Sequence, residues 1–540
     1  MLQYVTVTKQ KQQNEYIRIE NGCQQLRFKI CAGKEISVEK DEFFRQVSAQ
    51  LEELDYRELY SAYSGSIRKS QVEPRILFEL LVCAYALDEY RTRRIEQLCR
   101  NHVQFLLILD GRKPPDHTTI ARFRSGKKTG KAIQHLFEQY VNLLERKGET
   151  NHEAVFIDGT KIESKANRYT FVWRKRVERE LKKIKEKLKK YRTEEHGYTT
   201  MKKAQAYLDE LNREIAKANI EVKKGRGHHK PTIVRLRDEV QELVRRWMDY
   251  EEKLKTLGDG RNSFSKTDPD ATFMHMKEDH MRNGQLKPGY NVQFAVNSEY
   301  ITGIGVFSAR TDYSTLPIML KTMEEWQRDI YKRVCLDSGY ESLLNYRHLA
   351  GNKQLAYIKP NNYEAIKEKK FKAQIGRREN MAYYEQEDYF LCKAGRMLVR
   401  ISTTAEKEKD GSLKELAHYR CEDCCACPHR AACCKAKDLE KQKELVVCWE
   451  MEHLRKASLE RITSEEGKLL RVNRSIQAEG SFGQLKHNRN FNRFLTGGHI
   501  KVMTELCLLA LSQNIRKHIS KCNAQRQKTH LLRPKALLKF

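Results

Sequence analysis

Residues 153–164 read EAVFIDGTKIES, and this stretch decides the fold. Ala154 to Ile157 form a short apolar run, which is followed by an acid, a glycine and an alternating Lys-Ile-Glu. A short apolar run that ends in such residues is typical of a buried strand leading into its hairpin partner. The stretch therefore predicts a buried strand with Asp158 directly after it.

The same pattern recurs further along the chain, in VCLDSGY, where Val334 to Leu336 end in Asp337 and a serine-glycine pair. The predicted elements come in the order strand, strand, strand, helix, strand, helix, strand. This order predicts a mixed α/β sheet. The expected strands are Tyr169–Trp173, Tyr290–Val296, Tyr300–Ala309 and Leu355–Pro360, with a helix over Leu316–Ile330.

Upstream of this sheet, residues 40–150 have the apolar spacing of helices, as in LFELLVCAYAL and IEQLCRNHVQFLLIL. HTTIARFRS follows the breaker run GRKPPD and predicts a short helix, for which Asp116 or Thr118 is a candidate cap. This helix carries Arg122 and Arg124 and is compatible with a helical DNA-binding module. An ordinary all-α packing domain with a solvated basic face remains the alternative.

Residues 174–257 interrupt the strand region with a strongly charged helical segment. Apolar residues recur there at spacings of three and four along three seams, which is a coiled-coil signature. KKGRGHHKP at 223–231 breaks the pattern and turns the chain back. We therefore predict an inserted antiparallel helical hairpin with a basic tip.

The charge balance indicates a polyanionic partner. The 540-residue chain has 102 Lys plus Arg against 72 Asp plus Glu, a net charge of +30, and nucleic acid is the commonest partner of such a chain. A merely basic surface is the alternative. The most apolar stretch, Ile76–Leu87, is broken by Glu79 and too short to span a bilayer, and the N-terminus lacks the apolar core of a secretory signal. We expect no membrane partner and a cytoplasmic location.

Three acids at the ends of separate elements are candidate catalytic residues. Asp158 and Asp337 each follow a predicted strand, where open α/β sheets place their active sites, although turn chemistry explains either one alone. Glu479 lies seven residues before Lys486 and therefore shares a helix face with it. An amphipathic surface helix without a catalytic role is the alternative. Three such carboxylates suit a two-metal phosphoryl-transfer site with two Mg²⁺ or Mn²⁺ ions. The basic residues Arg474, Arg489 and Arg493 would then neutralise the DNA backbone.

Three further acids are rivals that we interpret as structural. Asp268 and Asp270 belong to the turn TDPD, and Asp312 is expected to cap a helix over Ser314–Ile318. Trp173, which precedes two basic residues, either stacks on an unpaired base near the cut or closes the sheet.

The cysteines indicate a metal site rather than disulfides. Of the fifteen cysteines, six fall within Cys421–Cys434. The spacing Cys421-x2-Cys424-x2-Cys427-x5-Cys433 suits tetrahedral Zn²⁺, with Cys425 and Cys434 as spare thiols. An iron–sulfur cluster and the absence of any metal are the alternatives.

The chain resembles bacterial insertion-sequence transposases of the DDE class. The resemblance rests on PPDHTTIARFR, FIDGTKIESKANRYTFVWRK, TDPDATFMHMKEDHMRNGQLKPGYNVQ, CLDSGYESLLNY and RSIQAEGSFGQLK, and covers about residues 45–520. It implies an RNase H-like core whose acidic triad is Asp158, Asp337 and Glu479. In related transposases a Tyr-Arg-Glu-Lys signature surrounds the last acid. Here Lys486 matches, Arg474 stands five residues before Glu479 instead of four, and Gly497 occupies a place where an arginine is expected.

The resemblance also implies a function. Such enzymes cut the ends of the element and join them to target DNA, which predicts double-stranded DNA as substrate and a homodimer on DNA associated with the bacterial nucleoid. A catalytically inactive DNA-binding regulator and a non-joining RNase H-like nuclease remain the alternatives. The predicted domains are an N-terminal extension (1–45), a helical DNA-binding domain (46–148), the first parts of the core (149–173 and 262–365), the helical hairpin (174–261), a Cys-rich insertion (366–460), the C-terminal helices of the core (461–520) and a basic tail (521–540).

Overall fold

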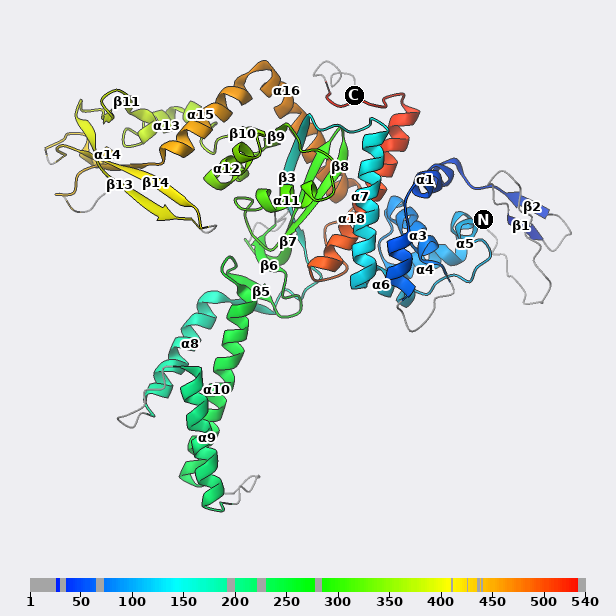
Figure 1. Ribbon diagram of the computed structural model, residues 1–540, viewed down its shortest axis with the longest axis horizontal. Coiled ribbons are helices and arrows are strands. Elements are labelled where there is room, and N and C mark those ends of the chain that lie inside the picture. Colours follow the sequence, from blue (N-terminus) through cyan, green and yellow to red (C-terminus); the bar gives the residue numbers. More distant parts are fainter. Residues whose placement is uncertain are drawn as a thin grey trace.

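A computed structural model gives the architecture of the chain (Figure 1). It describes residues 26–29, 35–64, 72–191, 200–220, 230–276, 284–408, 411–424, 426–434, 438 and 440–532. The tip of the predicted helical hairpin, residues 533–540 of the predicted basic tail and Cys425 lie outside the described residues.

Six strands form the central sheet: β3 (Ala154–Glu163), β6 (Thr272–His275), β7 (Leu286–Asn297), β8 (Tyr300–Phe307), β9 (Arg333–Leu336) and β10 (Leu355–Ile358). Their order is β10-β9-β3-β7, and both β6 and β8 pair with β7. β3 is parallel to β9 and antiparallel to β7, and β9 is parallel to β10. The sheet is therefore mixed, as predicted, and is compatible with an RNase H-like core.

Two predicted boundaries are wrong: the end of the strand that contains Asp158 and the end of the helix that begins at Leu316. β3 does not end before Asp158 but continues to Glu163, because its second half pairs with β7. Helix α11 (Leu316–Glu324) is shorter than the predicted Leu316–Ile330. Asp158 is therefore a residue inside a strand, at the point where the parallel pairing with β9 has ended.

The N-terminal region is helical and shares one hydrophobic core with the sheet. Helix α18 (His499–Asn523) lies between the two and contacts α3, α7 and β8 (Figure 1). Gly130 of α7 permits the close approach, since a Cβ there would lie 2.5 Å from Thr504 Oγ1 of α18. The N-terminal helices are α1 (Glu42–Glu52), α2 (Arg57–Ser64), α3 (Pro74–Ala86), α4 (Thr92–Asn101), α5 (Val103–Leu109), α6 (His117–Ser125) and α7 (Lys127–Arg146), preceded by the hairpin of β1 (Leu26–Lys29) and β2 (Glu35–Val38).

Three long helices project away from the sheet (Figure 1): α8 (Arg174–Lys189), α9 (Met201–Lys217) and α10 (Thr232–Leu257). They lie between β4 (Phe171–Trp173) and β5 (Ser263–Ser265), which pair with each other. α10 packs along both α8 and α9, and the apolar seams of the three helices form one cluster around Trp247. The helices thus bury the residues that the heptad-like spacing singled out.

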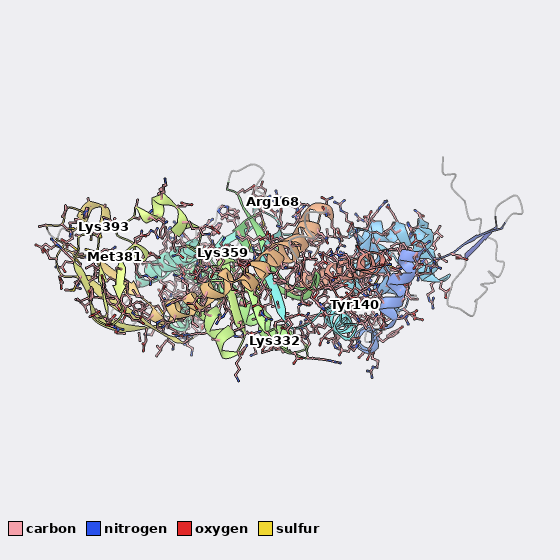
Figure 2. The ribbon with its side chains drawn as sticks, turned by 90° about the horizontal axis from the view of Figure 1, so that it is seen from above. Tyr140, Arg168, Lys332, Lys359, Met381 and Lys393 are labelled. Atoms are coloured by element: carbon pink, nitrogen blue, oxygen red, sulfur yellow. The ribbon has the colours of Figure 1, made fainter. Side chains whose placement is uncertain are left out.

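A second sheet, which the sequence analysis did not predict, follows the central one. Its antiparallel strands, in order, are β11 (Ala382–Tyr384), β12 (Tyr389–Leu391), β13 (Met397–Lys407), β14 (Leu413–Cys421) and β15 (Glu444–Val447). In Figure 2 the labels Met381 and Lys393 mark this sheet at one end of the molecule, while Tyr140 lies toward the N-terminal helices at the other. These strands follow Leu355–Pro360, the C-terminal strand among those expected from the sequence.

The chain returns to the central sheet through α15 (Trp449–Thr463) and α16 (Glu465–Arg474). The Ser458 hydroxyl of α15 contacts the backbone of Ile358 in β10 and fixes this helix on the sheet. The remaining short elements are η1 (Ser338–Tyr340), α12 (Leu343–Gly351), η2 (Ala365–Lys367), α13 (Lys369–Lys372), η3 (Arg378–Asn380), α14 (Arg430–Cys433), η4 (Ser475–Glu479), α17 (Gly480–Gly483) and η5 (Gln484–Asn488). In the described part of the chain, no helix has the length and apolar character needed to cross a membrane.

Candidate functional site

Asp158 and Asp337 lie at corresponding positions of two paired parallel strands. The register of β3 and β9 ends with Phe156 opposite Cys335, and each aspartate is two residues further along its strand. Because the strands are parallel, both aspartates lie at the same edge of the sheet. Asp158 is buried, and its Oδ1 accepts the N–H of Gly159 at 2.8 Å.

Asp337 begins the turn η1, where its Oδ1 accepts the N–H of Gly339 at 2.9 Å. A Cβ at position 339 would lie 3.1 Å from Oδ1 of Asp337 and 3.5 Å from Oδ2 of Asp312. The carboxylates of these two aspartates therefore face the same small space beside Gly339.

The sequence analysis expected Asp312 to cap a helix, and this expectation is wrong. The N-cap residue of α11 is Thr315, and Asp312 contributes only its backbone carbonyl to that turn. Its Oδ1 instead accepts the side-chain amides of Asn291 at 2.6 Å and Gln293 at 2.9 Å, both on β7. A Cβ at Gly159 would lie 3.0 Å from the same oxygen, so Asp312 stands next to the backbone of the residue that follows Asp158.

The direction of β8 indicates that Asp312 lies near Asp158 and Asp337. β8 is antiparallel to β7, which is antiparallel to β3, so β8 runs in the direction of β3. Its last residue, Phe307, therefore ends at the edge that holds Asp158 and Asp337. Asp312 follows five residues later, in the loop that leaves this edge.

Tyr340 lies beneath these carboxylates and was also missed. Its side chain is fully buried, and its hydroxyl has no hydrogen-bond partner among the residues that the structure describes. Burial raises the pKa of the phenol above its ordinary value, and the negative charges of Asp312, Asp158 and Asp337 add to this effect. A buried hydroxyl without a partner, close to three carboxylates, can donate to whatever occupies the space between them.

Glu479 approaches the same edge from the C-terminal helices, since η4 packs on β3 and β7. Its side chain is about half exposed (48%) and accepts from Arg474 Nη2 at 2.6 Å and from Ser475 Oγ at 2.9 Å. Nη1 of the same arginine lies 3.8 Å from Asp158 Oδ2. The Arg474 guanidinium thus stands between two members of the predicted triad.

The unexpected spacing of Arg474 has a structural explanation. Residues 475–479 form a π-helical turn, which contains one residue more than an α-helical turn. The wider turn brings Arg474 and Glu479, five residues apart, onto the same side of the helix. A second π turn, at Gln484–Asn488, carries Lys486.

The donors at this edge suit a hard divalent cation. Carboxylate oxygens are the ligands that Mg²⁺ and Mn²⁺ prefer, and Gly159 and Gly339 leave open the positions that a Cβ would fill beside Asp312 and Asp337. Among the described residues, no three His, Cys, Asp or Glu side chains are already arranged as a metal cage. Glu479 in particular is engaged by Arg474, so its side chain must turn to join the aspartates.

Several predicted DNA-binding residues are buried, and their roles need correction. Arg489 contacts Asp88 at 2.6 Å, the Ser512 hydroxyl at 3.0 Å and backbone carbonyls of α3 and α18. Arg124 donates to the Tyr85 hydroxyl and to a backbone carbonyl in the α3–α4 loop. These arginines hold elements together, and their burial argues against the predicted contacts with DNA.

Lys486 is also buried, and its Nζ donates to the carbonyl of Lys161 on β3 at 3.0 Å. This hydrogen bond ties η5 to β3, the strand that contains Asp158, and the buried ammonium group does not face a ligand. Arg493 is half exposed and binds the backbone that follows β3, whereas Arg122 is exposed on α6. Trp173 is half-buried against Phe273, with ring centroids 6.0 Å apart.

Gly497 replaces the expected arginine because a buried carboxylate lies against it. A Cβ there would lie 2.9 Å from Oδ2 of Asp268. Asp268 accepts from Ser164 at 2.5 Å, from Tyr290 at 2.8 Å and from the N–H of Gly498 at 3.0 Å. A side chain at position 497 would therefore have to displace this carboxylate, and the contacts of Asp268 agree with the structural role that its turn suggested.

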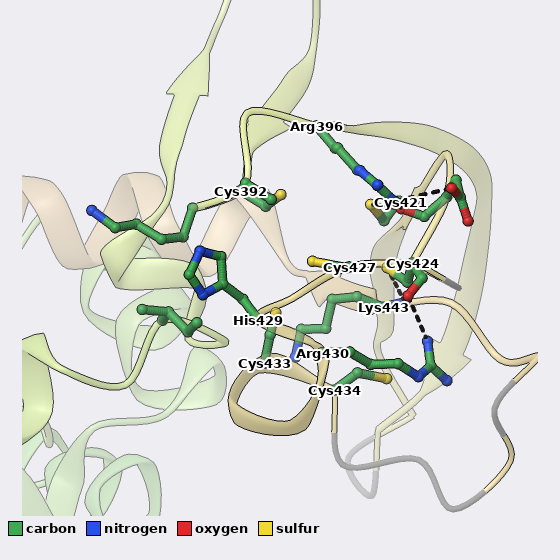
Figure 3. Close-up of a pocket in the computed structure, with 14 residues that line it drawn as sticks. Cys392, Arg396, Cys421, Cys424, Cys427, His429, Arg430, Cys433, Cys434 and Lys443 are labelled. Carbon is green, nitrogen blue, oxygen red and sulfur yellow. Dashed lines mark hydrogen bonds and ion pairs between the residues drawn. The ribbon is translucent and has the colours of Figure 1, made fainter.

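A pocket in the second sheet gathers the cysteines of the predicted zinc site (Figure 3). Cys421, Cys424, Cys427 and Cys433 all line it, and no disulfide joins the described cysteines. Burial raises the pKa of the Cys433 thiol, and the nearby Lys443 opposes this effect. Cys392, which the spacing argument left out, lines the same pocket.

Two family models match the chain. Residues 391–519 match the Transposase DDE domain, and residues 34–126 match the Transposase domain (DUF772). Together they support an insertion-sequence DDE transposase. The transposase family implies a DNA substrate and, in general, the use of divalent metal.

The two transposase matches fall on different parts of the structure. The DDE match includes Glu479, Arg474 and the cysteine pocket, and the other match covers α1–α6. Asp158, Asp312 and Asp337 lie outside both matched ranges, so their place in the site rests on the geometry of the sheet. No curated protein and no solved structure matches the chain significantly.

Proposed function

We propose that the chain is a transposase that cuts the ends of an insertion sequence and joins them to target DNA by metal-dependent phosphoryl transfer. The observation that carries this proposal is the placement of Asp158 and Asp337 at corresponding positions of paired parallel strands, with Glu479 on the helix beside them. The strand order, with β3 in the middle of the sheet, supports an RNase H-like core.

The proposed site contains four carboxylates, those of Asp158, Asp312, Asp337 and Glu479. Two divalent ions held there would activate the attacking oxygen and stabilise the leaving oxygen of the phosphodiester. Water is the first nucleophile, which frees the 3′-hydroxyl at the end of the element. This hydroxyl then attacks the target strand, so no covalent protein–DNA link forms.

Other residues of the chain position this set. Lys486 holds η5 against β3. Arg474 keeps the Glu479 side chain on the side of Asp158. The hydroxyl of Tyr340 is placed to donate into the space between the aspartates. The exposed cations Arg122, Lys127 and Lys128 near the α6–α7 junction would contact the DNA backbone and increase the salt dependence of binding.

The test is to incubate the purified chain with Mg²⁺ or Mn²⁺ and labelled DNA that ends in the terminal repeat of its own element. Cleavage at the repeat boundary, followed by joining to a second DNA, is the expected result. Specific binding without cleavage would instead favour the inactive regulator. Nicking that ignores the repeat, without joining, would favour a plain nuclease.

We also propose that two copies act together on DNA, because transposition brings two ends into one complex. The projecting helices α8–α10 would pair the protomers. Sedimentation of the protein with repeat DNA should then show two chains per complex. A species with a single chain, with and without DNA, would contradict the pairing.

Asp312→Asn is expected to weaken Mn²⁺ binding in the absence of DNA by about 10- to 100-fold, the range found when a group that supports a metal site is lost. The amide removes a negative charge from the space beside Gly339 but keeps the size of the side chain. Mn²⁺ binding can be measured by electron paramagnetic resonance. Asp329→Asn, which changes an exposed aspartate, is the matched control. Equal Mn²⁺ affinity in the two variants would remove Asp312 from the site.

A further inference from the structure

Cys392 lies far from the cysteine cluster in the sequence but lines the same pocket. It follows β12 directly, in the turn to β13, while the other thiols come from the last residue of β14, Cys421, and from the segment after it. Figure 3 shows its sulfur directed toward those of Cys421 and Cys427. Six thiols of the described residues line this pocket. The sulfur of Cys434 contacts the carbonyl oxygen of Lys441 at 3.9 Å, so a ligand set has to be chosen from the other five.

Local contacts distinguish Cys424 from Cys421. The sulfur of Cys424 accepts the backbone N–H of Lys443 at 3.4 Å, a contact that suits a thiolate. The sulfur of Cys421 lies 3.6 Å from the carbonyl oxygen of Asp423, to which only a protonated thiol can donate. Both residues belong to the apolar cluster of the second sheet, and Cys421 is the more deeply buried of the two, at 2% exposed against 7%. The contacts of Cys421 are thus those of a structural thiol.

The segment between Cys424 and Cys433 is held in a compact form. The N–H of Cys427 donates to the carbonyl of Cys424, and the N–H of Arg430 donates to that of Cys427. The Arg430 guanidinium binds the carbonyls of Asp438 and Lys441 and so closes the loop. These contacts fix the backbone at both cysteines of the Cys-x2-Cys pair.

The charges around the pocket favour several thiolates in one place. Four cationic side chains line it, those of Lys393, Arg396, Arg430 and Lys443. A divalent ion with four thiolates carries a net negative charge, and nearby cations lower the cost of burying that charge. Zn²⁺ in structural sites takes four such ligands in a tetrahedron.

We propose that Cys392, Cys424, Cys427 and Cys433 bind one Zn²⁺ ion, and that Cys421 remains a thiol. The ion would join the β12–β13 turn to the loop that follows β14 and so fix one end of the second sheet. Because no metal cage is preformed in the described part of the chain, the four thiols must rotate toward one another as the ion binds. This proposal is independent of the catalytic function of the chain.

The first test compares the metal content of the full-length protein and its serine variants. Wild type, Cys421→Ser and Cys448→Ser should retain about one zinc per chain, as a closed tetrahedral site holds, and Cys392→Ser should lose it. Cys448 is the matched control, because it lies in the same region, is partly exposed and does not line the pocket. Retention of zinc by Cys392→Ser, or its loss from Cys421→Ser, would overturn the ligand set.

A second test needs no variant and so does not depend on the folding of one. In wild-type protein, iodoacetamide should label Cys392 only after a chelator has removed the metal, as mass spectrometry can show. Equal labelling of Cys392 before and after chelation would overturn its assignment as a ligand. Wild-type protein without zinc, or with iron and sulfide in its place, would overturn the zinc site.

Discussion

Replacing Asp337 by Asn is expected to slow cleavage at a terminal repeat by at least about 10³-fold, because a metal contributes several kcal/mol of transition-state stabilisation and each 1.4 kcal/mol is a factor of about ten. Asn can still accept the N–H of Gly339 and begin η1, so the fold should be retained. The amide has lost the negative charge that draws a divalent ion to this edge. The rate of strand cleavage with Mg²⁺ measures the effect.

Asp329→Asn is the control for Asp337→Asn, since it removes a carboxylate of the same kind from an exposed position. DNA binding should be similar in both variants, because the proposed backbone contacts lie on other elements. If Asp337→Asn cleaved DNA at the wild-type rate, Asp337 would have to be removed from the proposed set. Loss of binding together with cleavage would show instead that the turn itself had been disturbed.

Arg489→Ala is expected to destabilise the protein by about 3 kcal/mol, the lower end of the range for breaking a buried charge pair. The variant leaves the acceptors on α3 and α18 without their donor, although Arg516 still contacts Asp88. The apparent melting temperature, followed by circular dichroism, should fall clearly below that of wild type.

Arg516→Ala is the matched control for Arg489→Ala, because Arg516 binds the same aspartate from an exposed position (43%). Such a pair contributes about 0–1 kcal/mol. Equal melting temperatures of the two variants would contradict the structural role of Arg489. The salt dependence of DNA binding gives a second criterion: the loss of a phosphate contact would lower its slope by about one, and we expect no such change for Arg489→Ala.

Local sequence was sufficient for the elements whose signals are local. The apolar run before Asp158 predicted β3, and the strands predicted at Tyr290–Val296 and Tyr300–Ala309 correspond to β7 and β8, which only Ser298 and Glu299 separate. Ser298 and Glu299 both have positive φ, which is what a tight connection between antiparallel strands requires. Asp158, Asp337 and Glu479 could likewise be proposed because each sits beside a clear element.

The roles of individual basic residues depend on distant partners and could not be predicted. Arg489 pairs with Asp88, about four hundred residues away in the sequence. Nothing in the residues around Arg489 or Arg124 distinguishes them from the exposed Arg122. Burial, which decides between a structural and a DNA-binding arginine, is a property of the packed fold alone.

The second sheet was missed because its strands are short or largely exposed. β13 alternates little between apolar and polar residues, and nearly all of its side chains face solvent. The period-two signal that identifies a half-buried strand is therefore weak there. Asp312 was missed for another reason, because only the direction of β8 places its loop at the edge of the site.

Helix α18 contacts the N-terminal helices on one side and β8 on the other, and all three belong to one core. A recombination event that exchanged residues 42–146 alone would leave the apolar side of α18 without its complementary surface. The N-terminal helices, which we propose contact the DNA backbone, therefore cannot be exchanged between relatives independently of α18. Under that proposal, changes in DNA recognition would arise by substitution within one cooperative unit, together with changes in α18.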